Sequence, residues 1–254
     1  MIRIGVDVGG TNTDAVVMKG KKFLGGAKSP TTSDILTGVE IKSALSESNT
    51  SSDDVDVLII GTTHFVNALV QRTKLAQTGV IRMCLPSGSS ILPFADWPNS
   101  LVSGMKGTYK LIKGGYEMTG SEISQLDHDE LISAARELSN MGCNQIAISS
   151  VFATVRGDME QEALEILTKE MPDLSITLSK SIGGMGLLER ENAAIINASL
   201  RPLAAEVIDS FKLLQKSLDL SCPMFFTRND GTLIEAKEVV ELPVLTFACG
   251  QTNS

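Results

Sequence analysis

The beginning of the chain combines carboxylates, glycines and threonines within eight positions. Asp7 and Asp14 flank the run 9–13, Gly-Gly-Thr-Asn-Thr. Backbone N–H groups of a glycine-rich turn can approach an anion closely, and threonine hydroxyls add donors for phosphate oxygens. A strand-end carboxylate beside phosphates suits Mg²⁺, which prefers carboxylate, water and phosphate oxygen as ligands. We therefore predict Asp7 and Asp14 as metal ligands, and as nucleotide-binding residues Gly9, Gly10, Thr11, Asn12, Thr13 and Asp14.

The residues on either side predict that this run is the tip of a β-hairpin. Residues 2–8 alternate apolar with other side chains, and residues 15–18 form a second apolar strand. The alternative is a purely structural hairpin, in which glycine supplies a positive φ and the polar side chains satisfy local backbone groups. The nearest match to G-x-x-x-x-G-K-[ST] starts at Gly20 and has Gly26 where lysine is required, so a P-loop is not indicated.

A second polar group follows the next predicted strand, residues 55–60. The sequence continues as Gly61-Thr62-Thr63-His64, with Asn67 in a short helix. In open α/β sheets, ligands bind at the carboxyl ends of strands. Thr62, Thr63 and Asn67 are therefore candidates to orient a substrate or the phosphoryl acceptor. His64 is either a base or ligand at this site, or a residue that packs at the start of the helix.

Length, composition and net charge limit the classes of protein to which this chain can belong. The chain has 254 residues, enough for one large or two small domains, with 43% hydrophobic and 20% charged residues, as in ordinary globular proteins. A net charge of -8 argues against nucleic acid or an anionic membrane as a partner, because both favour basic surfaces.

The four cysteines are far apart in the sequence. Cys84, Cys143, Cys222 and Cys249 have neither the spacing of a zinc site nor that of a disulfide framework. Buried free thiols in a reducing compartment are the expectation. No apolar stretch approaches the length of a membrane span, and Asp7 interrupts the first apolar run. These observations predict a cytoplasmic protein.

The middle of the chain alternates strand and helix patterns, which implies a largely parallel sheet with helices on its faces. Strands are predicted at 23–28, 80–85, 145–149 and 174–178, and helices at 35–45, 127–138 and 158–167. Residues 86–107 form a long excursion, and residues 109–116 an extended segment.

The glycine-rich stretch 181–186 predicts a boundary, with one domain at 1–182 and a second part at 183–254. Beyond it we predict one helix at 189–200 and another that starts at Pro202, because proline is favoured in a first helical turn. Strands are predicted at 223–227 and 244–248. Between them lie a turn at 228–232 and a short helix at 236–240.

Four separated stretches together resemble the hydantoinase/oxoprolinase A family of ATP-dependent amide hydrolases and related carboxylases. The first, the octet 7–14, is similar to the D-x-G-G-T-x-T-D phosphate signature of the wider actin-like ATPase and sugar-kinase superfamily. The other three are Gly61-Thr62-Thr63 with Asn67-Ala68-Leu69 and Arg72; Leu188-Glu189-Arg190-Glu191-Asn192 with Asn197-Ala198; and Asn229-Asp230-Gly231-Thr232 leading to Val244-Leu245-Thr246 and Gly250.

This resemblance implies an α/β fold: a ribonuclease-H-like or actin-like ATPase lobe, with a mixed sheet, N-terminal β-hairpins and flanking helices, followed by the start of a second lobe. The nucleotide would lie between the lobes, and a second phosphate hairpin would begin at Gly250, with Thr252 and Asn253 on the nucleotide. The family usually has Gly-Pro and small residues there, and often an aromatic residue at position 12, where this chain has Asn12. We expect the N-terminal part of a longer protein, inactive by itself.

The implied chemistry is ATP-driven opening of a cyclic amide of the hydantoin or 5-oxoproline type. Transfer of the γ-phosphoryl group to the amide oxygen activates the carbonyl, and the protein contributes positioning and charge neutralisation. ATP and Mg²⁺ are the implied cofactors, and the implied catalytic residues are Asp7, Thr62, Thr63, His64 and Asn67.

Several alternatives stay open. They are an ATP-dependent ketone carboxylase subunit, a small-molecule kinase and a non-catalytic actin-like ATP switch. A second subunit of the hydantoinase B type and a homo-oligomer are both compatible with the resemblance. Residues 189–191, Glu-Arg-Glu, form either an ion-pair network between lobes or a charged surface cluster.

Overall fold

The chain folds into two compact α/β units. The computed structural model describes residues 1–31 and 38–247. The first unit comprises Met1–Gln71 and Pro202–Ser254, and the second comprises Arg72–Arg201. The chain thus leaves the first unit, forms the second and returns. This division differs from the predicted boundary between residues 182 and 183.

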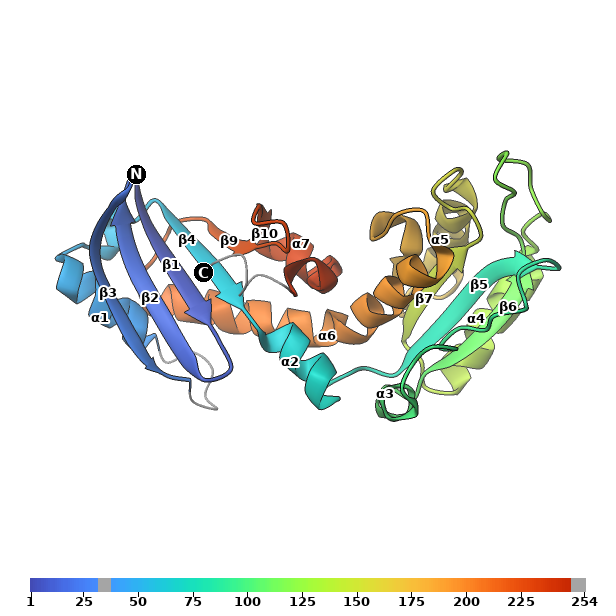
Figure 1. Ribbon diagram of the computed structural model, residues 1–254, viewed down its shortest axis with the longest axis horizontal. Coiled ribbons are helices and arrows are strands. Elements are labelled where there is room, and N and C mark those ends of the chain that lie inside the picture. Colours follow the sequence, from blue (N-terminus) through green and yellow to red (C-terminus); the bar gives the residue numbers. More distant parts are fainter. Residues whose placement is uncertain (32–37, 248–254) are drawn as a thin grey trace. The chain divides into compact units, whose positions relative to one another are not determined.

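A six-stranded mixed sheet forms the centre of the first unit (Figure 1). Strands β1, β2 and β3 form an antiparallel meander, whereas β4 runs parallel to β1, and β9 parallel to β4. The sheet order is β10-β9-β4-β1-β2-β3. The bounds are β1 (Ile2–Val8), β2 (Asn12–Lys19), β3 (Lys22–Pro30), β4 (Val57–Thr62), β9 (Met224–Thr227) and β10 (Leu233–Glu235).

One face of this sheet is the hydrophobic core of the first unit. The apolar alternation in β1 places Ile4, Val6 and Val8 on that face, all 5% exposed or less. Phe226 of β9 packs edge-on against Phe211 of α6 (Leu187–Ser217), with ring centroids 5.5 Å apart. The alternate positions of each strand, Asp7 and Asp14 among them, must therefore lie on the opposite face.

Shorter helices complete the first unit. They are α1 (Val39–Ser48), the 3₁₀ turn η1 (Ser52–Asp54), α2 (His64–Gln71), α7 (Ala236–Glu241) and η3 (Pro243–Thr246). The helix predicted at 35–45 is thus observed from Val39 on, and its predicted start lies outside the described residues. The strand predicted at 244–248 is wrong over its described part: Pro243 occupies the first position of η3, and Thr246 Oγ1 donates to Pro243 O at 2.9 Å.

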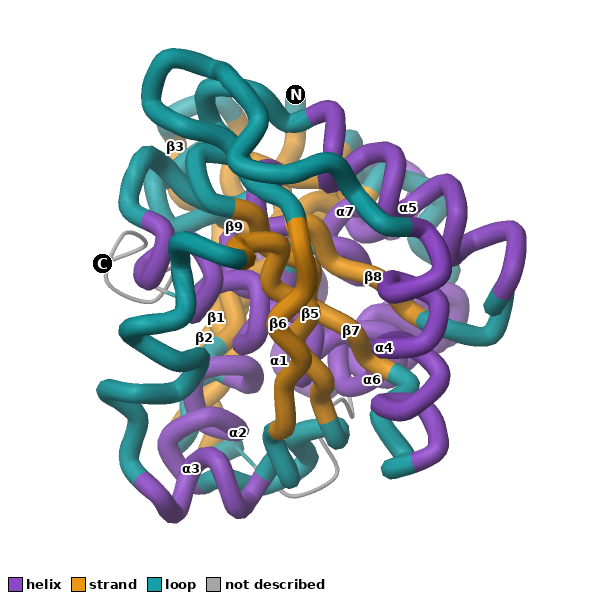
Figure 2. Tube along the Cα trace, turned by 90° about the vertical axis from the view of Figure 1, so that its right-hand side faces the viewer, coloured by secondary structure: helices purple, strands orange, loops and turns teal. Residues whose placement is uncertain are grey.

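A four-stranded parallel sheet in the order β6-β5-β7-β8 forms the centre of the second unit (Figure 2). The strands are β5 (Thr78–Leu85), β6 (Thr108–Lys113), β7 (Gln145–Ser150) and β8 (Ser175–Leu178). Helices α4 (His128–Asn140) and α5 (Asp158–Glu170) bury one face. The other face packs against α3 (Asn99–Gly104) and the first half of α6, and η2 (Ser179–Ser181) follows β8. The parallel βαβ arrangement is confirmed in this unit.

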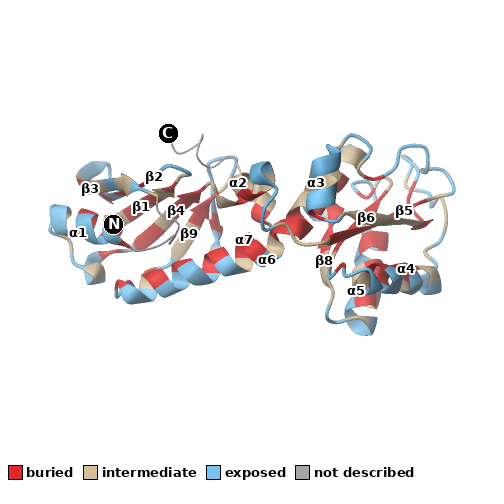
Figure 3. Ribbon diagram, turned by 90° about the horizontal axis from the view of Figure 1, so that it is seen from below, coloured by how far each residue is buried: buried red, intermediate tan, exposed pale blue. Residues whose placement is uncertain are grey.

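Helix α6 is continuous through Pro202, so the prediction of two separate helices is wrong. Buried residues recur along its whole length (Figure 3), from Ala194 and Ala198 to Leu203, Val207 and Phe211. An interior proline costs a helix about 3 kcal/mol, because it removes a hydrogen bond and crowds the preceding turn. The burial of this apolar stripe outweighs that cost.

No helix in the described ranges is long and apolar enough to cross a membrane.

Replacing the exposed Pro202 by alanine tests this balance. Pro202→Ala restores the missing N–H donor and loses no buried surface, so we expect the free energy of unfolding to rise by about 2 kcal/mol. Thermal or urea unfolding measures the change. Leu213→Ala, on the same helix at a side chain 69% exposed, serves as the control and should change little. Destabilisation by Pro202→Ala would contradict a penalty at this position.

Candidate functional site

A row of polar side chains crosses the face of the first unit's sheet that lies opposite the apolar core. Asp7 of β1 lies directly opposite Asp14 of β2, which in turn lies opposite Lys28 of β3. On the other side, Asp7 pairs with Gly61 of β4, and the register of Ile60 with Phe226 brings Thr227 beside Gly61. The row therefore spans five neighbouring strands.

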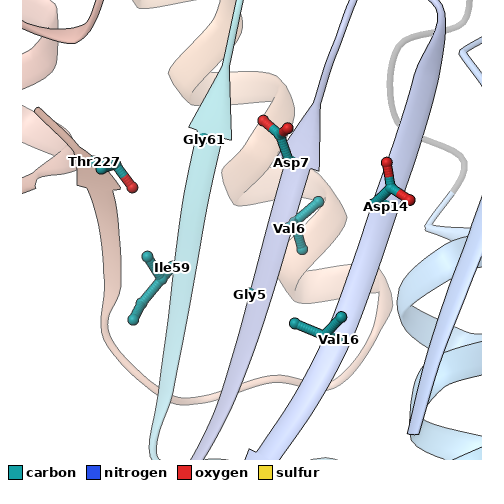
Figure 4. Close-up of a pocket in the computed structure, with 8 residues that line it drawn as sticks. All are labelled: Gly5, Val6, Asp7, Asp14, Val16, Ile59, Gly61 and Thr227. Carbon is teal, nitrogen blue, oxygen red and sulfur yellow. The ribbon is translucent and has the colours of Figure 1, made fainter. Parts of the chain in front are cut away.

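This row contributes to a pocket of about 410 Å³ on the sheet surface (Figure 4). Asp7, Asp14 and Thr227 place polar groups along the pocket, and Gly61 leaves a gap between Thr227 and Asp7. The lining residues come from β1, β2, β4 and β9, and are Gly5, Val6, Asp7, Asp14, Val16, Ile59, Gly61 and Thr227.

Asp7 carries the least compensated charge of the pocket. Its Oδ1 atom is buried and has no hydrogen-bond partner among the described residues. Burial raises the pKa of the Asp7 carboxyl, the nearby Asp14 carboxylate raises it further, and Lys28 opposes both. Lys28 Nζ lies 3.1 Å from Asp14 Oδ1 and 3.2 Å from Asp14 Oδ2, so Asp14 already has a cationic partner.

The pair of carboxylates fits a hard divalent cation. An unpartnered carboxylate oxygen next to a second carboxylate offers one or two oxygen ligands, which is the contribution that Mg²⁺ usually takes from a protein beside phosphate and water. Within residues 1–31 and 38–247, no group of three or more His, Cys, Asp or Glu residues could hold a metal ion. An all-protein cage is therefore not offered by the described part of the chain.

The hairpin tip beside Asp7 is closed by hydrogen bonds that come largely from Thr31. Gly9 N donates to Asn12 O at 3.0 Å, Thr31 N donates to Thr11 O at 2.8 Å, and Thr31 Oγ1 donates to Gly9 O at 2.9 Å. Because the Thr31 hydroxyl proton is used there, the 3.1 Å contact with Thr13 Oγ1 has Thr13 as donor. Thr13 is 8% exposed and ties the tip together, whereas Thr11 is exposed.

The two glycines of the tip allow neighbouring groups to approach the turn closely. Neither Gly9 nor Gly10 has a positive φ, so the conformational reason considered above does not apply. A Cβ on Gly9 would lie 3.0 Å from Asn12 O, and one on Gly10 would lie 3.3 Å from Asn67 Nδ2. Side chains at these positions would press against the turn and against α2.

The structure brings part of the second polar group to this tip. Thr63 N donates to Val8 O at 3.1 Å, and Asn67 Nδ2, beside Gly10, donates to Thr63 Oγ1 at 3.1 Å. Thr62 and His64 instead contact each other: the Thr62 hydroxyl bonds the His64 ring, and His64 N donates to Thr62 Oγ1 at 3.3 Å. Thr62 is 1% exposed, so its hydroxyl is not presented to solvent.

The remaining predicted nucleotide residues, Gly250, Thr252 and Asn253, lie outside the described residues. Asp230 and Gly231 form the predicted turn, with Gly231 at φ 79° and Thr232 N donating to Asp230 Oδ1 at 3.0 Å. Hydrogen bonds from Thr232 lower the pKa of Asp230.

Two of the three charged residues at 189–191 are buried in the second unit, so the alternative of a charged surface cluster is wrong for them. Glu191 accepts two hydrogen bonds from Arg82, one of them from Nε at 2.7 Å, and both side chains are fully buried. Arg190 is 1% exposed and donates to Ser179 Oγ at 2.9 Å and to Ser150 O at 2.6 Å. Glu189 is exposed.

A further buried carboxylate, Glu160, joins this arrangement. Glu160 accepts from Ser150 N at 2.9 Å, Ser179 Oγ at 2.6 Å and Lys180 N at 2.9 Å. Burial raises the pKa of Glu160 and lowers that of Arg190. These groups connect the ends of β7 and β8 to α5 and α6 within one unit.

Sequence reasoning missed two members of the polar row, Lys28 and Thr227. Lys28 falls in a segment predicted as an ordinary strand, and Thr227 is the last residue of an apolar strand. A polar residue at a strand end was the available signal for Thr227. Its position beside Gly61 depends on the pairing of β9 with β4, which no local pattern reveals.

The unfavourable position of the Asp7 charge predicts that Asp7→Asn stabilises the fold at neutral pH. Because the folded-state pKa is raised, the protonated form favours folding; this contribution is complete below the unfolded pKa of about 3.9 and is lost as the pH rises through the folded pKa. The neutral amide removes a like-charge pair worth up to about 1 kcal/mol. Thermal unfolding should therefore show a gain at pH 8 that shrinks toward pH 4.

Asp53→Asn, at an exposed carboxylate in η1, provides the control for this experiment. A loss of stability in Asp7→Asn at pH 8 would contradict the interpretation of Asp7 as an uncompensated charge.

The buried pair in the second unit gives a separate prediction. Glu191→Ala leaves the Arg82 guanidinium buried without its partner, and such a change costs about 3–5 kcal/mol. Glu189→Ala, two positions earlier on the same helix at an exposed carboxylate, should cost less than about 0.5 kcal/mol. Chemical unfolding of both variants measures the difference, and equal stabilities would refute a structural role for the pair.

Two known proteins are similar in sequence to nearly the whole of this chain. The caprolactamase subunit alpha of Pseudomonas jessenii is 23% identical over 273 residues, covering 99% of this chain and 39% of that protein. An uncharacterized protein of Methanocaldococcus jannaschii is 22% identical and is matched over 98% of this chain and 38% of its own length. The chain therefore spans about two fifths of the length of these relatives.

Solved structures show the same fold. An acetone carboxylase described as ATP-dependent, in a nucleotide-free structure, superposes with a TM-score of 0.77 at 16% identity, covering 99% of this chain and 39% of that one. The ATP-dependent caprolactamase of P. jessenii gives 0.74 at 21% identity, covering 92% and 36%. The predicted α/β fold of the actin-like type is confirmed by these likenesses.

The family assignment rests on a longer match. The sequence model of the hydantoinase/oxoprolinase N-terminal region matches residues 3–171, which is well over half of the chain and includes the phosphate-type octet and the second polar group. The chain therefore belongs to the hydantoinase/oxoprolinase family.

Proposed function

We propose that this chain is the N-terminal part of an ATP-dependent hydrolase that opens a cyclic amide of the hydantoin or 5-oxoproline type. One observation carries the proposal: the buried, unpartnered Oδ1 of Asp7 lies in a pocket at the end of β1, next to a glycine-threonine hairpin tip. A buried carboxylate oxygen without a partner lowers the stability of the fold, but it can serve as a ligand of the metal ion that accompanies a bound nucleotide.

The residues of the pocket and of the hairpin tip have different roles in this proposal. Asp7 holds Mg²⁺, with Asp14 beside it as the second carboxylate. The exposed tip residues Gly10 and Thr11 offer backbone donors to the phosphates, and Asn67 supports the tip from α2. Bound Mg²⁺ would neutralise negative charge on the phosphates. Thr62 and His64 fix the start of α2 through their mutual hydrogen bonds.

The reaction needs activation because an amide carbonyl is a poor electrophile. Transfer of the γ-phosphoryl group breaks the terminal P–O bond of ATP, forms a bond to the amide oxygen and releases ADP. One water then adds to the activated carbon, the ring C–N bond breaks with protonation of nitrogen, and a second water releases phosphate. The protein contributes positioning and charge neutralisation.

A ketone carboxylase subunit is the second candidate, favoured by the fold likeness to acetone carboxylase. A carboxylase would consume ATP only when bicarbonate and a ketone are present. A small-molecule kinase is less well supported: the pocket lining offers the carboxylates Asp7 and Asp14 alone, and β9 ends in Thr227 where an acceptor base could stand.

A second subunit of the hydantoinase B type is part of this proposal. It draws support from the relative in P. jessenii, which is named as a subunit alpha. We also propose a cytoplasmic location, for which the buried free thiols of Cys84, Cys143 and Cys222 are suited, while Cys249 lies outside the described residues.

Substitution of Asp7 in the complete protein tests the proposal. Asp7→Asn keeps the shape of the side chain and removes the charge that holds Mg²⁺, so we expect ATP turnover to fall at least about 100-fold. Asp53→Asn is the matched control and should turn over ATP at the normal rate. Undiminished turnover by Asp7→Asn would remove Asp7 from the reaction.

The same assay separates the candidate functions. ADP release that depends on a cyclic amide supports the hydrolase, dependence on bicarbonate with a ketone supports the carboxylase, and slow release indifferent to both supports an ATP switch.

A further inference from the structure

Thr227 stands at the edge of the pocket and is unused by the role assignments above. It is the last residue of β9 and is 5% exposed. Its side chain is one of the polar groups lining the pocket, and no described residue forms a hydrogen bond with it. Its oxygen is not one of the buried atoms without a partner, so the hydroxyl stays accessible from the pocket and is available to donate to a ligand, which a valine of the same volume could not do.

The sheet register places Thr227 opposite Asp7, with Gly61 between them. Neighbouring strands lie about 4.8 Å apart, so the backbones of β9 and β1 are about 10 Å from each other at this level. Because Gly61 has no side chain, the strand between Thr227 and Asp7 places no side chain between them on this face (Figure 4). This gap between Thr227 and Asp7, called the slot below, is part of the pocket of about 410 Å³, which is large enough for a phosphoryl group or a hydrated cation.

The charges along the row are unequal. Lys28 neutralises Asp14 at one end, which leaves Asp7 as the carboxylate that faces the slot without an ion-pair partner among the described residues. Thr227 contributes a neutral hydroxyl on the other side. Together these groups suit an oxygen-rich anion bridged to Asp7 by a metal ion, with a hydrogen-bond donor on its far side.

We propose that Thr227 Oγ1 donates a hydrogen bond to the terminal phosphoryl group of the nucleotide, and so is a further catalytic residue of the pocket. This inference rests on the proposed function of the site. It gives Thr227 the task of holding the transferred group in line with the amide oxygen that accepts it.

A hydroxyl group at the position of Thr227 suits phosphoryl transfer to an amide oxygen. A kinase acceptor is an alcohol that must lose its proton, which calls for a carboxylate base near the acceptor. An amide oxygen carries no proton, so its attack on phosphorus needs no base. A threonine at the end of β9 can donate to phosphate but cannot serve as a base at neutral pH.

Two substitutions in the complete protein test this role. Thr227→Val removes the hydroxyl at nearly constant volume, and we expect kcat/KM for ATP to fall about 10- to 100-fold with no loss of thermal stability. Thr227→Ser retains the hydroxyl and should recover activity to within a few-fold of the unchanged protein. Thr168→Val, the same substitution at an exposed threonine of α5 outside the pocket lining, is the control and should alter turnover less than about 3-fold.

Direct binding distinguishes a phosphoryl contact from general disruption. In calorimetry with Mg²⁺, Thr227→Val should weaken a non-hydrolysable ATP analogue about 10-fold and leave ADP binding unchanged, because ADP lacks the terminal phosphate. Equal weakening of both ligands, or unchanged analogue binding, would overturn the role of Thr227. If Asp7→Asn is inactive while Thr227→Val turns over ATP normally, this inference fails and the proposed function survives. Absence of ATP turnover in the unchanged complete protein would overturn both.

Discussion

The placement of one carboxylate against another on neighbouring strands is the constraint on which the site depends. Asp7 and Asp14 are direct partners in the register of β1 and β2, and like charges in that position oppose folding. Lys28 compensates Asp14 from β3, while Asp7 keeps a buried oxygen without a partner among the described residues. The fold tolerates this arrangement because the opposite face of the same strands is a well-buried apolar core.

The period of two along a strand links these two faces. The side chains of Ile4, Val6 and Val8 must point into the core, so the side chain of Asp7 must point away from it, and Gly5 occupies a position of the same outer face. A slip of one residue would exchange the two sets and destroy core and pocket together. The position of the Asp7 carboxylate is therefore as firmly determined as the core itself, which is what a metal-binding group requires.

The second unit also contains buried charged side chains. Arg82 and Glu191 pair fully inside the unit, and Glu160 accepts hydrogen bonds from both β7 and the segment after β8. These charged groups have partners, in contrast to Asp7. Satisfied networks of this kind fix the arrangement of the elements that they connect, whereas an unsatisfied group marks a place where a ligand can contribute.

The sequence by itself determined the hairpin with its glycine-threonine tip, the candidates Asp7 and Asp14, the βαβ rhythm of residues 80–178 and the family resemblance. Those features are local: alternation, turn residues and short motifs express them over a few positions. Tertiary structure alone decided that β9 joins β4, that Thr227 and Lys28 complete the polar row, that Glu191 is buried with Arg82, and that α6 continues through Pro202. Each of these depends on contacts between residues far apart in the chain, where burial and strand pairing outweigh the local preference that a sequence pattern records.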